Sequence, residues 1–200
     1  MANVGQPRDP VTEWEERIAA QFRALKAWAT RRGCLLTACD LPPRDFGWSG
    51  QEHEVYHEAS GRRFWKSTFP GQCGFGQFGY YTPAGYLHRL RLSNIVFGDD
   101  VEFEGIWPRP GGLSIVTSQS YIQPHPLRFI PTEAEIGAFL DALGFAWDDN
   151  TMTWHRDDGV ELADTHDRNF IIAPDGNIRA IDVQPRLKPG FDFDSVKKPA

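Results

Sequence analysis

Apolar residues recur at every third or fourth position in the first part of the chain, which is the period of an amphipathic helix. Thr12 and Glu15 have the spacing of a capping box, and Gly33 follows the last apolar position as a stop signal. The pattern therefore predicts a helix from about Thr12 to Gly33 that packs one face on a core. Its apolar positions are Trp14, Ile18, Phe22, Leu25 and Trp28.

Further along, short β-rich runs alternate with two more helical patterns, which together predict an α+β fold. We expect a hairpin of residues 54–58 and 62–67 around the loop Ala59-Ser60-Gly61, and a second pair of strands at 101–107 and 113–119. Helices are predicted over 83–97 and from the capping box of Thr132 and Glu135 to Gly144. Short strands are expected at 146–147, 152–154, 170–172 and 178–181.

Composition narrows the class of protein. The 200 residues, 22.7 kDa, are enough for one domain or two closely packed lobes with a sizeable core. The net charge of −6 and the lack of a Lys/Arg block argue against nucleic acid as a partner. No apolar run is long enough for a membrane span, and residues 1–10 lack a signal-peptide pattern, so no membrane association is expected. Cys34, Cys39 and Cys73 cannot all pair within the chain, which favours a reducing, cytoplasmic compartment.

Residues 53–57 match the H-E-x-x-H motif of zinc hydrolases, in which a helix places two imidazoles on one face. The surrounding β-branched and aromatic residues favour a strand instead. Four residues of strand would separate His53 and His57 by about 13 Å, which is too far for one zinc ion. A zinc hydrolase is therefore the less favoured alternative, and we expect two solvated strand histidines.

A second motif, G-x-G-x-x-G from Gly74 to Gly79, is followed roughly twenty residues later by Asp99 and Asp100, as in dinucleotide-binding folds. In those folds the glycines open the helix directly, so that its N-terminal amides face the pyrophosphate. Here residues 80–83 intervene, and the alternating βαβ pattern is missing. We therefore interpret the segment as a loop rather than a dinucleotide site.

Three polar residues later in the chain have the spacing of a phosphoryl-transfer site. Asn169 follows Asp164 by five positions, and Asp182 stands thirteen positions after Asn169, beyond a predicted hairpin. In protein-kinase-like catalysis such an Asp accepts the substrate hydroxyl proton, while the Asn and the second Asp hold Mg²⁺. The alternative is that these are ordinary acids of turns and strand ends.

A kinase also needs a lysine on a strand to hold the ATP phosphates, and Lys66 lies in the predicted hairpin upstream of Asp164. The usual partner of this lysine is a glutamate on the following helix, but residues 83–97 contain no carboxylate. With a three-residue hairpin loop, Glu54 would fall directly opposite Lys66, within cross-strand pairing distance. We therefore predict that Glu54 orients Lys66.

Four segments together resemble the serine/threonine/tyrosine kinase-like domain of bacterial and phage polyvalent proteins. They are EHEVYHEASGRRFWKSTFPGQCGFG, TPAGYLHRLRLSNIVFGDDVEFEGIW, IVTSQSYI and DTHDRNFIIAPDGNIRAIDV, within residues 50–185. The resemblance implies a reduced two-lobe protein-kinase-like fold, with a β-rich N-lobe carrying one helix over 50–118. A hinge and a minimal C-lobe with the catalytic loop would follow over 119–200, and residues 1–49 would form an N-terminal helical extension.

The resemblance also implies a nucleotide site, with ATP and Mg²⁺ as cofactors. Residues 118–121 would be the hinge whose backbone meets adenine, and Gln119 and Tyr121 would contact the nucleotide. Domains of this family often lie in proteins carried by mobile genetic elements. The other implied roles are Lys66 on the phosphates, Asp164 as catalytic base, and Asn169 with Asp182 on Mg²⁺.

Departures from protein kinases lead to two hypotheses. Only Trp48-Ser-Gly50 stands where a glycine-rich loop would precede Lys66, and Val183-Gln184 replaces Phe-Gly after Asp182. The position of His166, two residues after Asp164, is closer to that found in kinases of small molecules. The chain continues only to residue 200, so we expect a C-lobe truncated after the metal-binding Asp. The first hypothesis is an ATP- and Mg²⁺-dependent phosphotransferase acting on a protein or small-molecule hydroxyl. The second is a catalytically degenerate module that binds nucleotide or a partner protein.

Overall fold

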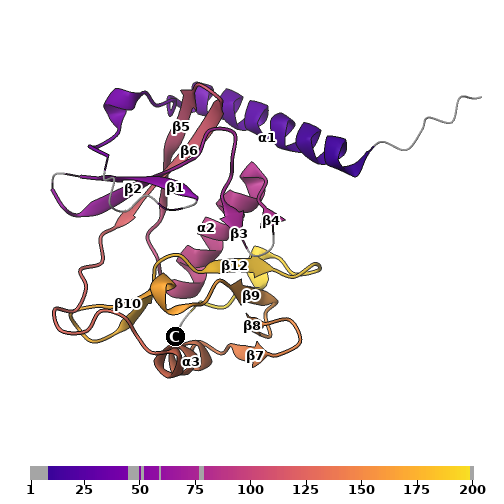
Figure 1. The fold of residues 1–200 in the computed structure, drawn as a ribbon. Coiled ribbons are helices and arrows are strands. Elements are labelled where there is room, and N and C mark those ends of the chain that lie inside the picture. The colour runs from indigo at the N-terminus through magenta and orange to yellow at the C-terminus, as the bar shows by residue number, and fades with distance from the viewer. Residues whose placement is uncertain (1–8, 45–49, 51, 59, 77–78, 199–200) are drawn as a thin grey trace, which may run out of the picture.

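Helix α1 opens the fold in the computed structural model, which describes residues 9–44, 50, 52–58, 60–76 and 79–198 (Figure 1). It spans Pro10–Arg32, and the Asp9 side chain caps it by accepting a hydrogen bond from the Val11 backbone N–H. The helix thus begins before the predicted box at Thr12, because an Asp cap followed by proline is itself a strong start signal. It ends as predicted at Gly33, which has a left-handed φ of 71°.

A four-stranded antiparallel sheet forms the upper half of the molecule in Figure 1, and we call it the N-terminal sheet. Its order is β1-β2-β6-β5, so the two predicted strand pairs join through β2 and β6. A short ribbon of β3 (Phe75–Gly76) and β4 (Gly79–Tyr80) precedes the next helix. The four strands are β1 (His53–His57), β2 (Arg63–Thr68), β5 (Glu102–Arg109) and β6 (Gly112–Ser120).

Helices α1 and α2 pack on this sheet in one apolar core. Helix α2 (Pro83–Phe97) starts as predicted, with the Thr82 hydroxyl accepting from the Gly85 N–H, and ends before Gly98. The core consists of Phe22 and Ala29 from α1, Cys73, Tyr86 from α2, and Ile106 and Ile115 from the sheet. The first helix is therefore packed into the same core as the sheet.

The chain after α1 runs beside β5 at very short range. Leu36 donates its N–H to the Ile106 carbonyl (2.8 Å), and Ile106 donates to the Cys34 carbonyl (3.0 Å). A Cβ atom on Gly105 would lie 2.4 Å from that same Cys34 oxygen. Only glycine allows this close approach, which fixes the segment that follows α1 to the sheet.

A second antiparallel sheet, the C-terminal sheet, forms the lower half in order β12-β9-β8-β7. Helix α3 (Glu133–Ala142) begins at the predicted capping box of Thr132 and Glu135, which is confirmed in both hydrogen bonds. The sheet strands are β7 (Ala146–Asp148), β8 (Thr153–His155), β9 (Val160–Ala163) and β12 (Gln184–Leu187), and the predicted hairpin is β10 (Phe170–Ile172) with β11 (Ile178–Ala180). Single 3-10 turns lie at Ala38–Asp40, Asp167–Asn169 and Phe193–Ser195.

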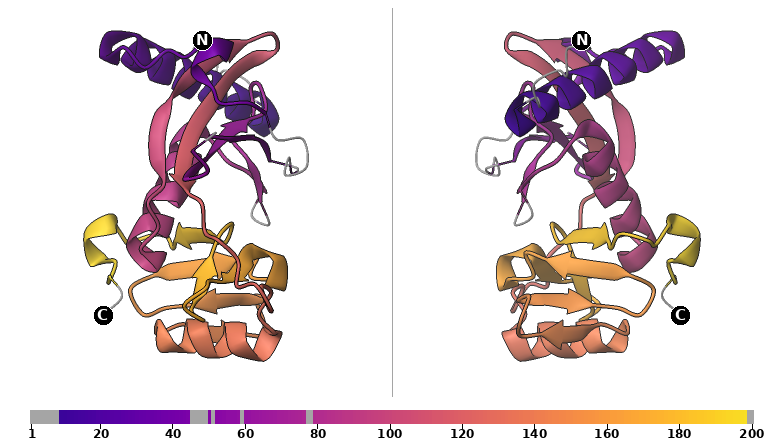
Figure 2. Two further views of the ribbon diagram at one scale, coloured as in Figure 1. Left: turned by 90° about the vertical axis from the view of Figure 1, so that its left-hand side faces the viewer. Right: turned by 90° about the vertical axis from the view of Figure 1, so that its right-hand side faces the viewer.

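Helix α2 belongs to both halves. Its Tyr86 lies in the first core, whereas Val96 lies in a second core with Ile136 and Leu140 of α3 and Leu162 of β9. Figure 2 shows α2 running from the N-terminal sheet toward the C-terminal sheet, with α1 and α3 at opposite ends of the molecule. One rigid helix therefore fixes the distance between the two sheets.

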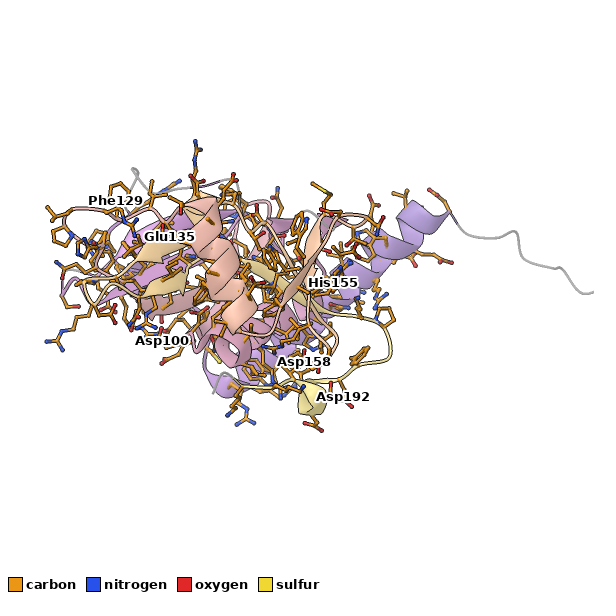
Figure 3. All side chains as sticks on the ribbon, turned by 90° about the horizontal axis from the view of Figure 1, so that it is seen from below. Asp100, Phe129, Glu135, His155, Asp158 and Asp192 are labelled. Carbon is orange, nitrogen blue, oxygen red and sulfur yellow. The ribbon has the colours of Figure 1, made fainter. Side chains whose placement is uncertain are left out.

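The C-terminal segment is tied to the C-terminal sheet by a buried ion pair. Arg156 donates to both carboxylate oxygens of Asp158 (2.9 and 2.8 Å), and Asp158 also accepts from the Lys197 N–H (2.8 Å). Figure 3 shows Asp158 near the segment that carries Asp192. Among the described residues, no helix is both long and apolar enough to span a membrane, and the three cysteines are free thiols.

Candidate active site

A cavity of about 660 Å³ lies between the two sheets. Its walls come from β1 and β2, from the end of β6 and the segment that follows it, and from the chain between β9 and the start of β12. The lining includes six of the seven residues singled out from the sequence as nucleotide, catalytic or metal residues. These are Lys66, Gln119, Tyr121, Asp164, Asn169 and Asp182.

Lys66 and Asp182 face each other inside this cavity. The Lys66 ammonium lies 3.8 Å from Asp182 Oδ1 and 3.5 Å from the carbonyl oxygen of Ile181. The cavity walls desolvate Asp182, which acts to raise its pKa, but the positive charges of Lys66 and Arg89 outweigh this and lower the pKa. Asp182 is therefore ionised at neutral pH and available to a cation.

Asp164 is held in an unusual backbone conformation. Its φ is 57°, one of two positive values among the described non-glycine residues, and such strain often marks a functional position. Asn169 Nδ2 donates to the Asp164 carbonyl oxygen (2.7 Å), which stabilises the loop between β9 and β10. His166 Nδ1 accepts from the Arg168 N–H, so Nε2 carries the proton that faces Asp164 Oδ1 at 3.2 Å.

The end of β6 and the segment after it contribute side chains to the cavity, but two backbone donors there are occupied. The Ser120 N–H donates to Asp100 Oδ1 (2.9 Å), and the Tyr121 N–H donates to the carbonyl oxygen of Arg62 (2.8 Å). These two N–H groups are therefore not available to donate hydrogen bonds to a nucleotide base. The Tyr121 ring packs edge-on against Phe64, with centroids 5.1 Å apart.

The lining of the cavity has a charged part and an apolar part. The charged part contains Lys66, Asp164 and Asp182. The apolar part is formed by Val55, Phe64, Tyr121, Ile122 and Ile171. Apolar and aromatic side chains of this kind commonly line the sites of small-molecule ligands.

The family model of the serine/threonine/tyrosine kinase found in polyvalent proteins matches this chain over residues 19–189. The chain belongs to this kinase family. No curated protein and no solved structure matches it. The match confirms the resemblance expected over residues 50–185, and it also takes in most of α1 and the segment that fixes α1 to the sheet.

The register of the β1–β2 hairpin in this polyvalent-protein kinase differs from the register predicted from the sequence. The turn holds four residues rather than three, because Glu58 pairs with Arg63, so Val55 is the residue opposite Lys66. Glu54 lies opposite Ser67, on the other face of the sheet from the cavity. The prediction that Glu54 faces and orients Lys66 is wrong.

Glu54 instead forms a buried ion-pair cluster outside the cavity. Arg109 donates to Glu54 Oε2, and Arg44 Nη1 lies 2.9 Å from Oε1. Burial acts to raise the pKa of Glu54, but the hydrogen bond and charge of Arg109, together with Arg44, lower it overall. The role of Glu54 in the kinase domain is therefore to hold β1, β5 and the segment before β1 together.

A further acid near Lys66 is Asp99, which follows α2. Lys66 and Asp99 line a small cavity of about 20 Å³ behind the main one, and Ser93 Oγ donates to the Asp99 carboxylate. Burial raises the pKa of Asp99 to about 6, with Ser93 and the charge of Lys66 acting in the opposite direction. Sequence reasoning considered Asp99 and Asp100 only as ribose-binding acids.

The structure also bears on the two other motifs, H-E-x-x-H at residues 53–57 and G-x-G-x-x-G at residues 74–79. His53 and His57 lie on strand β1, and no group of three or more His, Cys, Asp or Glu side chains suited to a metal ion occurs among the described residues. His53 is buried rather than solvated, with its Nε2 2.8 Å from the Tyr86 hydroxyl, and burial lowers its pKa to about 3. The described sheet strands pair antiparallel, which excludes a doubly wound dinucleotide fold.

Sequence reasoning missed three polar residues of the site. Glu52 and Gln184 line the cavity, and Arg89 reaches Glu52 from α2. A signal for Arg89 existed, since it lies three positions from both Tyr86 and Leu92 on the buried face of its helix. A charged residue on such a face requires a buried partner.

Proposed function

We propose that this kinase-family chain is an ATP- and Mg²⁺-dependent phosphotransferase that acts on a hydroxyl group. The observation that carries the proposal is the convergence of Lys66 and Asp182, with Asp164 and Asn169 on the wall of the same cavity. A cation, two carboxylates and an amide are the groups that phosphoryl transfer requires for positioning and charge neutralisation.

In this proposal the nucleotide spans the two parts of the cavity. The adenine ring lies in the apolar part against Phe64 and Tyr121, and the Gln119 side chain supplies a hydrogen-bonding group at its edge. The phosphates extend toward Lys66, whose ammonium binds them as a point charge. The occupied N–H groups of Ser120 and Tyr121 favour base recognition through side chains and carbonyl groups.

Asn169 and Asp182 suit Mg²⁺ by their chemistry. Mg²⁺ prefers oxygen ligands and commonly takes only one or two from the protein, the rest being water and phosphate oxygens. Because Asn169 Nδ2 donates to the Asp164 carbonyl, its amide oxygen is the atom left for a metal. Bound Mg²⁺ would neutralise charge on the phosphate oxygens.

Asp164 acts as the general base of the proposed reaction. Its carboxylate accepts the proton of the acceptor hydroxyl as that oxygen forms a bond to the γ-phosphorus, and the bond from phosphorus to the ADP oxygen breaks. His166 and Asn169 keep the Asp164 carboxylate and backbone in place during the step. Lys66 stabilises the negative charge on the transferred phosphate.

The two sheets correspond in this proposal to the two lobes of a small kinase fold. The N-terminal sheet ends at Ser120, and the C-terminal sheet and α3 follow residue 121, which supports an N-lobe over 50–118 and a hinge with a minimal C-lobe over 119–200. Residues 1–49 would then support the N-lobe through α1. The apolar core that Phe22 and Ala29 share with the sheet favours this role.

The test is ATP turnover by purified protein with γ-labelled ATP and Mg²⁺, comparing the parent with Asp182→Asn. We expect the parent to consume ATP or transfer label, and the variant to lose about 100-fold in rate. Asp175→Asn is the matched control, since Asp175 lies in the nearby β10–β11 turn and pairs with Arg179. Metal-dependent ATP binding without turnover would instead support the degenerate binding module, and no binding by the parent would refute both.

A further inference from the structure

Four polar side chains form a continuous chain from helix α2 to Asp164. Arg89 Nη2 of α2 lies 2.7 Å from Glu52 Oε2, just before β1. Gln184 Nε2, at the start of β12, lies 3.3 Å from Glu52 Oε1 and 3.2 Å from Asp164 Oδ2. The chain crosses from the N-terminal half of the molecule to the C-terminal half.

The chain is buried along most of its length. The side chains of Arg89 and Glu52 are only 4% and 12% exposed, and Gln184 is 4% exposed. A buried ion pair is strongly destabilised when one partner is removed, because the other is left as an uncompensated charge. Arg89 and Glu52 therefore hold each other in one geometry, and α2 sets the position of the Glu52 carboxylate.

Gln184 is suited to connect two carboxylates. Its amide nitrogen carries two protons, so the same atom can donate one to Glu52 and one to Asp164. Two acids so close to each other would repel without such a donor between them. With His166 Nε2 on Oδ1 and Gln184 Nε2 on Oδ2, both oxygens of Asp164 have a donor.

We propose that Gln184 is a positioning residue for Asp164, and that the Arg89–Glu52 ion pair makes this positioning depend on the placement of α2. The inference rests on the proposed function, in which Asp164 is the base. Helix α2 has no carboxylate to pair with Lys66. Helix α2 instead acts on the site through the guanidinium of Arg89. Its effect reaches the proposed base Asp164 rather than Lys66.

The first test replaces Gln184 with methionine, which keeps the side-chain length and removes the donor. We expect kcat for ATP turnover to fall about tenfold, while KM for ATP and the Kd of Mg·ATP stay within about twofold of the parent, because the nucleotide contacts are retained. Gln123→Met is the matched control, since Gln123 is exposed and belongs to the segment after β6. Loss of ATP affinity with unchanged kcat would overturn the proposal.

The second test removes the ion pair from α2. Replacing both Glu52 and Arg89 with methionine avoids an unpaired buried charge and so favours a folded protein. We expect kcat to fall as in Gln184→Met, and the triple variant to be no slower than Gln184→Met alone, because the changes interrupt one chain. Arg91→Met serves as control, since Arg91 lies on the same helix but packs over Phe193.

The outcomes separate the two proposals. Additive losses in the triple variant, or a double variant with the kcat of the parent, would show that α2 does not act through Gln184 and would overturn the coupling. An active parent whose kcat is unaffected by Gln184→Met would overturn this inference and leave the phosphotransferase proposal intact. A parent that binds no Mg·ATP would refute the phosphotransferase and the positioning role together.

Discussion

Lys66 and Asp182 bring opposite charges from the N-terminal and C-terminal halves of the molecule to within 3.8 Å of each other, Nζ to Oδ1. Their side chains are 20% and 49% exposed, so both reach the open cavity while their charges compensate. Lys66 lies in the middle of β2, and Asp182 lies in the short connection between β11 and β12. The pair therefore defines where a phosphate group and a cation can meet in the cavity.

Replacing Lys66 with methionine should abolish efficient use of ATP. The methionine keeps the volume of the side chain but removes the charge that would bind the phosphates. We expect kcat/KM for ATP to fall about 100-fold, measured by ATP consumption under excess Mg²⁺. Lys26→Met, on the exposed side of α1, is the control, and retention of ATP turnover by Lys66→Met would contradict the assigned role.

Replacing Glu54 with glutamine should weaken the fold and leave ATP binding unchanged. At pH 7 the variant loses the ion pairs with Arg109 and Arg44, and we expect a loss of about 2 kcal/mol in the free energy of unfolding. The pKa of Glu54 is lower in the folded protein, so its stabilising effect is present above the ordinary value of 4.5 and is lost as the pH falls below it.

Urea unfolding at pH 7 and pH 3 measures this difference, which should shrink at the lower pH. Binding of Mg·ATP, measured by titration calorimetry, is the second readout. If Glu54→Gln lost ATP affinity at unchanged stability, Glu54 would be acting on Lys66 despite lying on the other face of the sheet.

Asp99 should have the opposite pH dependence. Because its pKa is raised from 3.8 to about 6 in the folded protein, the stability linked to this group is fully present below pH 3.8 and is lost as the pH rises through 6. Asp99→Asn removes that loss, so at pH 7.5 the variant should be more stable than the parent by roughly 3 kcal/mol. At pH 3.5 the two proteins should unfold at the same urea concentration.

The neighbouring Asp100 provides the control for this prediction. Asp100 accepts hydrogen bonds from Ser120 and Arg63, and its pKa is lowered despite partial burial. Asp100→Asn should therefore destabilise the protein at pH 7.5. A destabilising Asp99→Asn at the same pH would mean that Lys66 requires the Asp99 charge.

Local patterns are sufficient to predict most helices and strands. They are not sufficient to predict which residues of two strands pair. Caps and periodicity place α2 and α3 correctly because those signals act within a few residues. The predicted β1–β2 register differs from the register in the structure by one residue, since the turn length depends on the pairing of Glu58 with Arg63. Strand β12 is not among the predicted strands. It contains Pro185, which is disfavoured inside a sheet, but β12 lies at a sheet edge, where proline is tolerated.

The residues of the candidate site also fall into two groups, those that the sequence predicts and those that it does not. Lys66, Asp164 and Asp182 were placed together by spacing along the chain, and all three line the cavity. Glu52 and Gln184 carry no such spacing, because their contacts join segments far apart in the sequence. Partners of that kind follow from tertiary packing, which a single sequence does not display.

The last prediction concerns α1 and its place in the cooperative unit. Phe22 is 8% exposed and lies in the core with Tyr86 and Ile115, so Phe22→Ala should leave a cavity that costs about 3 kcal/mol in the free energy of unfolding. Val11, on the same helix, is 61% exposed, and Val11→Ala should change stability by no more than about 0.5 kcal/mol.

Urea denaturation followed by circular dichroism and by tryptophan fluorescence tests both variants. For Phe22→Ala we expect one transition, shifted equally in the two signals, because α1 and the N-terminal sheet share a core and unfold together. An unchanged midpoint for Phe22→Ala, or a separate early transition of the helix alone, would instead show that α1 is an appendage whose packing does not support the site.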